Sequence, residues 1–306
     1  MGVLFSWRLL VLLACATVLW YMPRQLRRRP SKIAHELVAA TPVPQPQPAL
    51  CPGLGMACDC PRSTSSWAAT PTTRERVCAR LQSPAVLFVG DSLMRDTWSA
   101  GALWLLMAEL PPIRDCMFAA WPNAEAAIAA ARRQGLLTEV LTPHASVSTF
   151  HVCDRRVRLV FRYGRLFVDL PAVREEARAQ RAVGLVITHG ILEMSEHGEA
   201  GVLPWASALA RLGMPVVYLG AHSRIAALAP PEFADVAKGA QGNAALQRRT
   251  ALVRSVADGR WLRVADAFNL TAELGPGYRD TVDGLHFGGW INLQRFLLAL
   301  HVRWAA

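Results

Sequence analysis

The sequence predicts an α/β protein whose mainly parallel sheet is covered by helices on both faces. Short apolar runs rich in β-branched residues, flanked by turn residues, are typical of buried parallel strands, and they lie at 85–89, 184–188, 215–219 and 261–265. Helix-like segments alternate with them, at 93–109, 123–134, 172–182, 203–212, 243–257 and 290–303. Residues 146–169 alternate apolar and polar side chains, which indicates an antiparallel hairpin or an added strand pair.

Length and composition fit one sizeable domain with appendages, or two small domains. The chain has 306 residues, of which 52% are hydrophobic and 18% are charged, and these values exclude a disordered protein. The net charge is +10 at pH 7, and nearly all basic residues are arginines scattered along the chain. Because they are not gathered with aromatic residues in a nucleic-acid-binding motif, we expect a solvated basic surface or one that attracts acidic glycans, and no nucleic-acid partner.

Residues 1–22 predict an N-terminal membrane anchor. The stretch 9–22 carries no charge, and apolar residues upstream extend it to a length that can span a bilayer. Counted from Leu9 alone, the segment is closer to a signal-peptide core. An uncleaved anchor is favoured because no small-x-small cleavage site follows it. Residues 23–50, basic and then proline-rich, indicate an extended stem.

Two features disagree about the side of the membrane on which the rest of the chain lies. Arginines and Lys32 follow the anchor, and the positive-inside rule would leave the main domain in the cytosol. Outside the anchor the cysteines are even in number and lack metal-finger spacing, which favours a lumenal domain with up to three disulfides: Cys51, Cys58, Cys60, Cys78, Cys116 and Cys153. We expect the lumenal orientation. The triplet at 269–271, NLT, is a candidate glycosylation acceptor there.

After the stem, residues 51–82 predict a cysteine-containing lead-in, and residues 83–306 predict the catalytic domain. The stretch SPAVLFVGDSLMRDTW opens this domain, at 83–98. Gly90 lets the backbone turn sharply at the end of the first strand, so Ser92 would begin the next helix. Backbone N–H groups there lack partners and the helix dipole favours developing negative charge, which suits a nucleophile. The alternative is that Asp91 or Ser92 only caps the helix.

The other end of the chain supplies the partners that a serine nucleophile needs. The stretch YRDTVDGLHFGGWINLQRF, at 278–296, places Asp283 and His286 three residues apart before an amphipathic helix. A serine hydroxyl becomes an effective nucleophile when a histidine takes its proton and an acid orients that histidine. Because both residues come from one turn, a single loop can direct them toward Ser92.

These two stretches together resemble the first and last blocks of the SGNH/GDSL-type hydrolases, and within them the PC-esterase group. The motif FVGDSLMRDTW, with Arg95 three residues after Ser92, and the motif DGLHF carry the resemblance. It extends over about residues 67–303 and includes STFHVCDRRVRLVFRYGRLFV and GLVITHG. The group contains the plant trichome-birefringence-like polysaccharide O-acetyltransferases and the sialate and capsule-type O-acetyltransferases.

The resemblance implies a three-layer α/β/α domain on a Golgi-type membrane anchor, which transfers an acyl group, commonly acetyl, to or from a sugar hydroxyl. Ser92 would be acylated, His286 would move the proton and Asp283 would orient the imidazole. The partners implied are an acyl donor and a glycan acceptor. The alternative within the same superfamily is a carbohydrate or lipid esterase, in which water replaces the glycan. No cofactor is expected. The alternative from another class is a catalytically silent relative that binds glycans or scaffolds other Golgi proteins.

The residues that would hold the oxyanion and the substrate are less clearly marked in the sequence. The family draws its oxyanion donors from the nucleophile's backbone, a glycine, and often an asparagine after a middle strand. Here the strand end reads ITHGILEM, so Thr188 and His189 replace that asparagine and Gly190 follows them. Candidates for these roles are therefore Gly90, Asp91, Arg95, Thr188, His189 and Gly190, with Gly164 as a further candidate for the glycine donor.

Histidines elsewhere in the chain do not indicate a metal site. The sequence spacing of His144, His151, His197 and His301 is not that of metal ligands, and we expect none. His222 follows a strand and could line the site, although loop histidines of this kind are commonplace.

Overall fold

The computed structural model of the chain describes residues 74–81, 84–106, 122–141, 146–164, 170–188, 199–239, 241–275, 281 and 283–301. The predicted anchor (1–22) and stem (23–50) lie outside these residues, as does the lead-in up to residue 73. Among the helices that the structure describes, none is both long and apolar enough to cross a bilayer.

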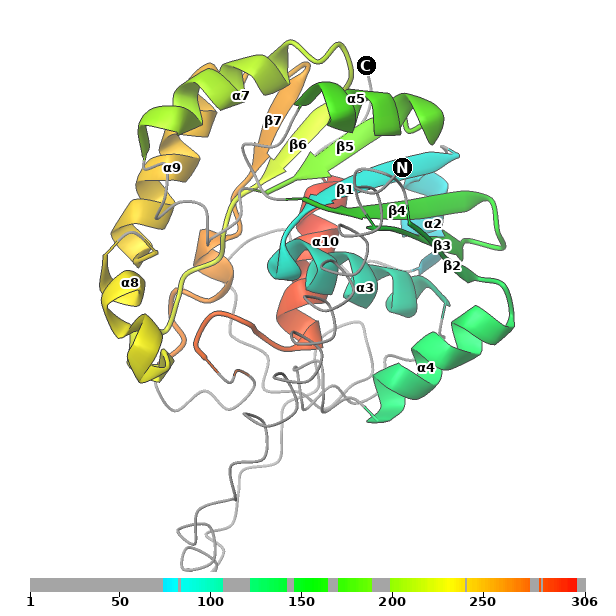
Figure 1. Cartoon of the computed structure of the whole chain (residues 1–306), viewed down its shortest axis with the longest axis horizontal. Coiled ribbons are helices and arrows are strands. Elements are labelled where there is room, and N and C mark those ends of the chain that lie inside the picture. The colour runs from blue at the N-terminus through cyan, green and yellow to red at the C-terminus, as the bar shows by residue number, and fades with distance from the viewer. Residues whose placement is uncertain are drawn as a thin grey trace, which may run out of the picture. The chain divides into compact units, whose positions relative to one another are not determined.

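A seven-stranded sheet lies at the centre of the described structure, in the order β2-β3-β4-β1-β5-β6-β7 (Figure 1). The strands are β1 (Ala85–Gly90), β2 (Leu137–Leu141), β3 (Ser146–Val152), β4 (Val157–Tyr163), β5 (Gly184–Ile187), β6 (Val216–Leu219) and β7 (Leu262–Ala265). Strands β4, β1, β5, β6 and β7 are parallel, whereas β3 is antiparallel to β2 and β4. The predicted α/β class with a mainly parallel sheet is confirmed.

Helices cover both faces of this sheet (Figure 1). They are α2 (Arg74–Arg80), α3 (Ser92–Leu106), α4 (Pro122–Arg133), α5 (Leu170–Ala179), α7 (Val202–Ala210), α8 (Ala234–Lys238), α9 (Asn243–Val256) and α10 (Gly289–His301). Strand β1 shows how side chains divide between the faces. Ala85, Leu87 and Val89 pack in one core with α5, α7 and α9, whereas Val86 and Phe88 pack in the other with α2, α3 and α10.

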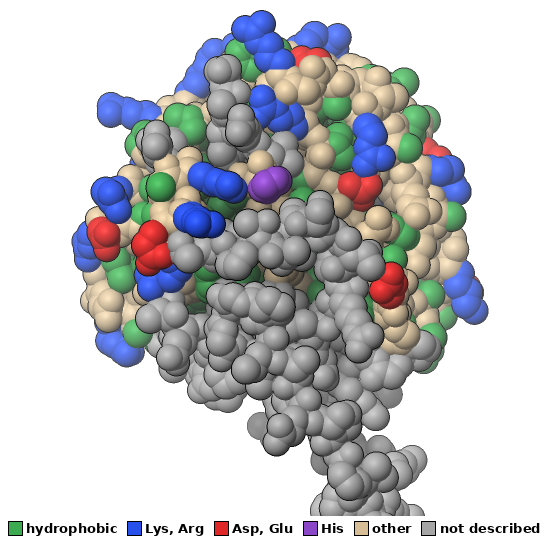
Figure 2. All heavy atoms as spheres, turned by 180° about the vertical axis from the view of Figure 1, so that it is seen from behind, with side chains coloured by type: hydrophobic (Ala, Val, Ile, Leu, Met, Phe, Trp, Pro, Cys, Tyr) green, Lys and Arg blue, Asp and Glu red, His purple; other side chains and the backbone are tan. Residues whose placement is uncertain are grey.

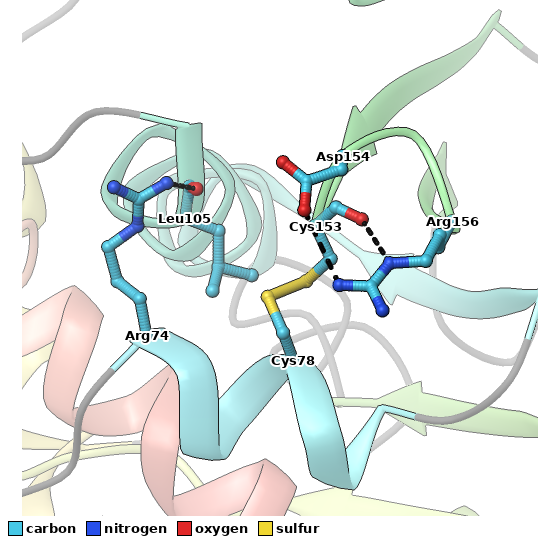
Figure 3. Close-up of a disulfide and its surroundings, with 6 residues drawn as sticks. All are labelled: Arg74, Cys78, Leu105, Cys153, Asp154 and Arg156. Atoms are coloured by element: carbon cyan, nitrogen blue, oxygen red, sulfur yellow. Dashed lines mark hydrogen bonds and ion pairs between the residues drawn. A yellow bond between two sulfur atoms is a disulfide. The ribbon is translucent and has the colours of Figure 1, made fainter.

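The hairpin predicted within 146–169 consists of β3 and β4, which pair antiparallel. Cys153, Asp154 and Arg155 in the turn between them have left-handed φ values of 53°, 55° and 64°. Cys153 forms a disulfide with Cys78 of α2, and their Cα atoms are 5.6 Å apart (Figure 3). The disulfide therefore ties the described part of the lead-in to the sheet. The remaining cysteines of the predicted disulfides lie outside the described residues: Cys51, Cys58, Cys60 and Cys116.

Basic side chains are spread over the molecular face shown in Figure 2, among hydrophobic and other side chains. Several exposed arginines pair with carboxylates, as in Arg132 with Glu139 and Arg248 with Glu199, each at 2.9 Å. Exposed pairs of this kind contribute little to stability. On that face, the positive charge is thus dispersed among other side chains.

The sheet topology places the end of β1 where ligands bind in proteins of this class. Strands β4 and β5 are the two neighbours of β1. The chain builds β2, β3 and β4 on one side of β1 and then crosses to β5 on the other side. Ligands of open α/β sheets bind at such a switch point, outside the carboxyl ends of the strands. Gly90, the last residue of β1, lies at this point.

Candidate active site

Ser92 is the first residue of α3, directly after the turn that leaves β1. Gly90 allows the close packing of this turn, because a Cβ atom there would lie 2.7 Å from Met94 Cβ and 2.8 Å from Thr188 Cγ2. Asp91 Oδ1 accepts a hydrogen bond from Leu93 N–H at 3.0 Å. Asp91 therefore caps the helix, and the Ser92 hydroxyl is left for another partner.

That partner is His286, which the fold brings to Ser92 across 194 positions of sequence. Ser92 Oγ lies 3.0 Å from His286 Nε2, and His286 Nδ1 lies 2.7 Å from Asp283 Oδ2. The carboxylate can only accept, so Nδ1–H donates to it and Nε2 is left to accept the Ser92 hydroxyl proton. The histidine and aspartate side chains are only 22% and 18% exposed. The structure thus brings the three predicted catalytic residues together in one chain of hydrogen bonds.

Asp283 also shapes the loop that carries it. Its Oδ1 accepts hydrogen bonds from Leu285 N–H at 2.9 Å and His286 N–H at 2.7 Å. One carboxylate oxygen therefore holds the loop backbone, and the other holds the imidazole.

Two further residues fix the conformation of this loop. Thr281 Oγ1 donates to His286 O at 2.8 Å and accepts from Gly284 N–H at 3.1 Å. Gly284 has a left-handed φ of 69°, and a Cβ atom there would meet the carbonyl oxygen of Ile225. Ile225 N–H in turn donates to Gly284 O at 2.8 Å. Glycine is therefore required at 284 both for its backbone angle and for the close approach of the 225 segment.

His222 supports the same loop from within the protein. Its Nε2–H donates to Leu285 O at 2.6 Å, and its ring meets the Phe287 ring edge-on with centroids 4.9 Å apart. Burial lowers the pKa of His222 well below the usual histidine value, so the ring is neutral. The strand-end position had suggested that His222 could line the site. Its side chain instead packs beneath the residue that precedes His286.

The charges of the triad stabilise one another. Burial alone would lower the pKa of His286, but the hydrogen bond and charge of Asp283 raise it above the usual histidine value. Burial alone would raise the pKa of Asp283, but the hydrogen bonds and charge of His286 and the loop N–H groups lower it to about 2. The Asp283 carboxylate therefore stays ionised at the pH at which the imidazole begins to take up a proton.

Asp96, a second carboxylate, also raises the pKa of the His286 imidazole through its charge, although the sequence motifs did not mark this residue. It lies four residues after Ser92, so it faces the same side of α3 one turn further along. Burial raises the pKa of Asp96 to about 6, against the opposing charges of His286, Arg95 and Arg295. The spacing of Ser92 and Asp96 on one helix was the available signal.

Among the predicted oxyanion and substrate residues, the described ones lie at the site in different ways. Arg95 Nε is 3.8 Å from Asp96 Oδ1, and both side chains are partly buried. Thr188 is buried, and its N–H donates to Val89 O at 3.3 Å. Gly164 N–H donates to Gly90 O at 3.1 Å. The N–H groups of Thr188 and Gly164 therefore form backbone hydrogen bonds with the end of β1.

The remaining candidates from that strand end, His189 and Gly190, lie outside the described residues. Within the part of the chain that the structure describes, histidine, cysteine and acidic side chains form no group of three or more arranged to hold a metal ion.

No family model matches the chain, and no curated protein matches it. One similar solved structure is a protein from Slackia heliotrinireducens that is provisionally described as an SGNH hydrolase. It has a TM-score of 0.40 and 14% sequence identity, over 72% of this chain and 98% of that one. A likeness of this size carries no argument about function. The fold and the contacts themselves define an α/β protein with a serine–histidine–aspartate arrangement at the carboxyl edge of a parallel sheet.

Proposed function

We propose that the chain is an SGNH/GDSL-type enzyme that transfers an acyl group through an ester on Ser92. The observation that carries this proposal is the chain of hydrogen bonds from Ser92 Oγ to His286 at 3.0 Å and from His286 to Asp283 at 2.7 Å. An imidazole so placed can take the serine proton, and the carboxylate stabilises the imidazolium that results. The resemblance of the sequence around Ser92 and His286 to the PC-esterase motifs supports the same class.

In the first half-reaction, Ser92 Oγ attacks the carbonyl carbon of the acyl donor while its proton passes to His286 Nε2. The carbonyl oxygen then carries a negative charge. Ser92 N–H lies in the first turn of α3, where N–H groups lack intrahelical acceptors and the dipole favours an anion, so we assign it as one oxyanion donor. His286 then gives its proton to the leaving group, and the acyl group remains on Ser92.

In the second half-reaction, His286 takes a proton from the acceptor hydroxyl as that oxygen attacks the acyl-serine. Breakdown of the second tetrahedral intermediate returns the proton to Ser92 Oγ. A glycan hydroxyl as acceptor makes the enzyme an O-acyltransferase, and water makes it an esterase. We propose the glycan and an acetyl group, in keeping with the resemblance to polysaccharide and sialate O-acetyltransferases.

A catalytically silent relative is the second candidate, and one observation favours it. The family's frequent asparagine donor is replaced, and the N–H of Thr188 at this position is bound to Val89 O at 3.3 Å. A site that lacks one oxyanion donor loses about a hundredfold to a thousandfold in rate. Such a loss slows acylation but does not abolish it, so the silent candidate makes the stronger prediction of an intact triad without any acylation of Ser92.

Acylation of the full-length chain in detergent by an activated aryl acetate separates the two candidates. The enzyme predicts stoichiometric acetylation of Ser92, measured by mass spectrometry of peptides, and loss of the label in Ser92→Ala. Ser99→Ala is the matched control, because Ser99 lies on the same helix with its hydroxyl bonded to Asp96 O at 3.2 Å. If wild-type protein is not labelled by any acyl donor, the chain is a silent relative.

An acceptor assay then separates the transferase from the esterase. With an oligosaccharide present, the transferase forms acyl sugar faster than free acid, as measured by chromatography. Free acid as the main product at saturating acceptor would assign the esterase.

We also propose that the protein is a single-pass membrane protein of the Golgi or another secretory-pathway membrane, with the catalytic domain in the lumen. The even set of cysteines and the disulfide between Cys78 and Cys153 support an oxidising compartment. Asn269 of the NLT triplet is exposed. Sealed microsomes should protect the domain from protease, and Asn269→Gln should abolish a mobility shift caused by N-glycosidase. Digestion of the domain in sealed microsomes would place it in the cytosol.

A further inference from the structure

Three polar side chains are buried between α3 and α10, directly behind the serine and histidine. Thr97 of α3 and Asn292 and Arg295 of α10 are 0%, 4% and 0% exposed. Burial of polar and charged groups is costly unless they form hydrogen bonds. Because the surrounding helix interface is otherwise apolar, the hydrogen bonds of these side chains must compensate for the cost of burying them.

One end of this group holds the residue next to the nucleophile. Leu93 O accepts a hydrogen bond from Thr97 Oγ1 at 2.9 Å and another from Arg295 Nη1 at 3.2 Å. Leu93 is covalently joined to Ser92. A shift of these donors would therefore move the first turn of α3, and the serine with it.

The other end holds the residue next to the histidine. Asn292 Nδ2 donates to Phe287 O at 2.8 Å, and Phe287 directly follows His286. Asn292 Oδ1 accepts from Thr97 Oγ1 at 3.3 Å and from Arg295 Nη1 at 3.4 Å. The amide of Asn292 thus joins the segment that carries His286 to the segment that carries Ser92.

The positive charge of Arg295 is balanced by two carboxylates near Ser92. Burial lowers the pKa of Arg295 to about 10, and the carboxylates of Asp91 and Asp96 oppose that effect. Its Nε and Nη2 atoms have no hydrogen-bond partner among the described residues. The guanidinium is therefore held by attraction to carboxylates that flank Ser92, in addition to the bonds of Nη1.

We infer that Thr97, Asn292 and Arg295 form a positioning clamp that sets the distance between Ser92 Oγ and His286 Nε2. This inference rests on the proposed function. The hydrogen bonds of the clamp reach the backbone carbonyls of Leu93 and Phe287, so the clamp acts through the backbone next to Ser92 and His286. Proton transfer from the serine requires the two atoms to stay within hydrogen-bond reach, and a displacement on the order of 1 Å costs about a hundredfold in rate.

Thr97→Val tests the clamp with little change of shape, and Thr250→Val is its matched control. Thr250 is also buried in a helix and donates to the carbonyl four residues earlier, Leu246 O, at 3.1 Å. We expect Thr97→Val to lower the saturating rate of Ser92 acylation about tenfold at unchanged half-saturating ester concentration. Thr250→Val should leave that rate unchanged at a similar loss of thermal midpoint. Equal rate losses in the two variants would overturn the clamp.

A second measurement does not depend on turnover. In full-length protein labelled with ¹⁵N-histidine, Ser92→Ala should shift the imidazole resonances of His286, because it removes the hydrogen bond to Nε2. In an Asn292→Leu background that shift should be lost, whereas in a Thr250→Val background it should remain. A shift of the same size in the Asn292→Leu background would show that the clamp does not set the contact. Absence of acylation in wild-type protein would instead overturn the proposed function, and this measurement would still decide the clamp.

Discussion

The two segments that supply the candidate site are held in place by different means. The nucleophile turn, residues 90–93, lies between a strand and a helix that are both buried in the core, and Asp91 caps that helix from within the turn. The histidine loop, residues 281 and 283–288, forms only an isolated bridge between Thr281 and Phe287. It is fixed by side-chain bonds from Asp283, Thr281 and His222. The course of the nucleophile turn is thus set by the strand and the helix that flank it, with the clamp acting on Leu93, whereas the histidine loop depends on polar side chains along its whole length.

The largest expected effect comes from removing Ser92, His286 or both, which tests whether the two segments act as one unit. Ser92→Ala, His286→Ala and the double variant should each lose at least about ten-thousandfold in acyl transfer, because the hydroxyl is a poor nucleophile without the imidazole. The losses should be equal rather than multiplicative. Steady-state rates of the two single variants and the double variant measure this. Multiplicative losses would mean that the two residues act separately.

Asp283→Asn separates the charge of the histidine loop from its shape. The asparagine Oδ1 can still accept the loop N–H groups, but its amide cannot accept from Nδ1–H, and we expect a loss of about a thousandfold to ten-thousandfold. In wild-type protein the rate should rise with pH through a His286 pKa that lies above the usual value, because only the neutral ring accepts a proton. In the variant this inflection should move to lower pH. A pH–rate profile with an unmoved inflection would contradict the assigned partner.

Gly284→Ala should damage the histidine loop more than an equivalent change elsewhere. The left-handed backbone and the nearby Ile225 carbonyl leave no room for a methyl group, so we expect a loss of about 1–3 kcal/mol of stability and about a hundredfold in rate. Gly259→Ala is the matched control, since Gly259 has the same φ of 69° with no atom within 4 Å of the added Cβ. It should carry the backbone strain alone and keep full activity. Denaturant unfolding and acylation rates compare the two variants.

Acid should destabilise the protein through Asp283 of the histidine loop. The pKa of Asp283 is about 2 in the folded protein against 3.8 ordinarily. Its contribution, about 2 kcal/mol, is present above pH 4 and is lost as the pH falls toward about 2. Unfolding free energies of wild-type protein and Asp283→Asn should converge over that range. If the two free energies of unfolding instead changed in parallel with pH, the Asp283 carboxylate would not be stabilised in its ionised form by the folded protein.

The smallest expected effect concerns the nucleophile turn. Asp91→Ala removes the cap of α3 and should lower the free energy of unfolding by about 1 kcal/mol, with a change in rate of only a few-fold. Asp91→Asn keeps an acceptor for Leu93 N–H and should restore the part of the stability that comes from the cap, but not the part that comes from the charge of Asp91 near Arg295. If Asp91→Ala lost as much activity as Gly284→Ala, the nucleophile turn would depend on Asp91 as strongly as the histidine loop depends on Gly284.

The sequence predicted the parallel strands and the helices between them because their apolar periodicity is local. Strand β2 was missed, since its central residues are exposed and its order depends on pairing with β3 at the sheet edge. Helix α8 has only five residues, too few to show a period. The Ser92, Asp283 and His286 contacts were predictable because the motifs mark the end of a strand and a single turn.

Other parts of the site were not predictable, because they depend on burial. Asn292 and Arg295 are polar residues of α10, and the structure buries both. One signal was present: Arg295 is four residues after Ile291 and three before Leu298, within the apolar stripe of α10. A charged residue inside such a stripe predicts a buried partner, but the identity of that partner is set by how α3 and α10 meet.

The order of the elements along the chain decides when reactivity arises. Ser92 is made early and His286 is made 194 positions later, just before α10. Until His286 has been made, the Ser92 hydroxyl lacks the base that would take its proton. For the proposed enzyme, acylation of Ser92 therefore becomes possible only after the segment that carries His286 has been made and α10 has packed against α3.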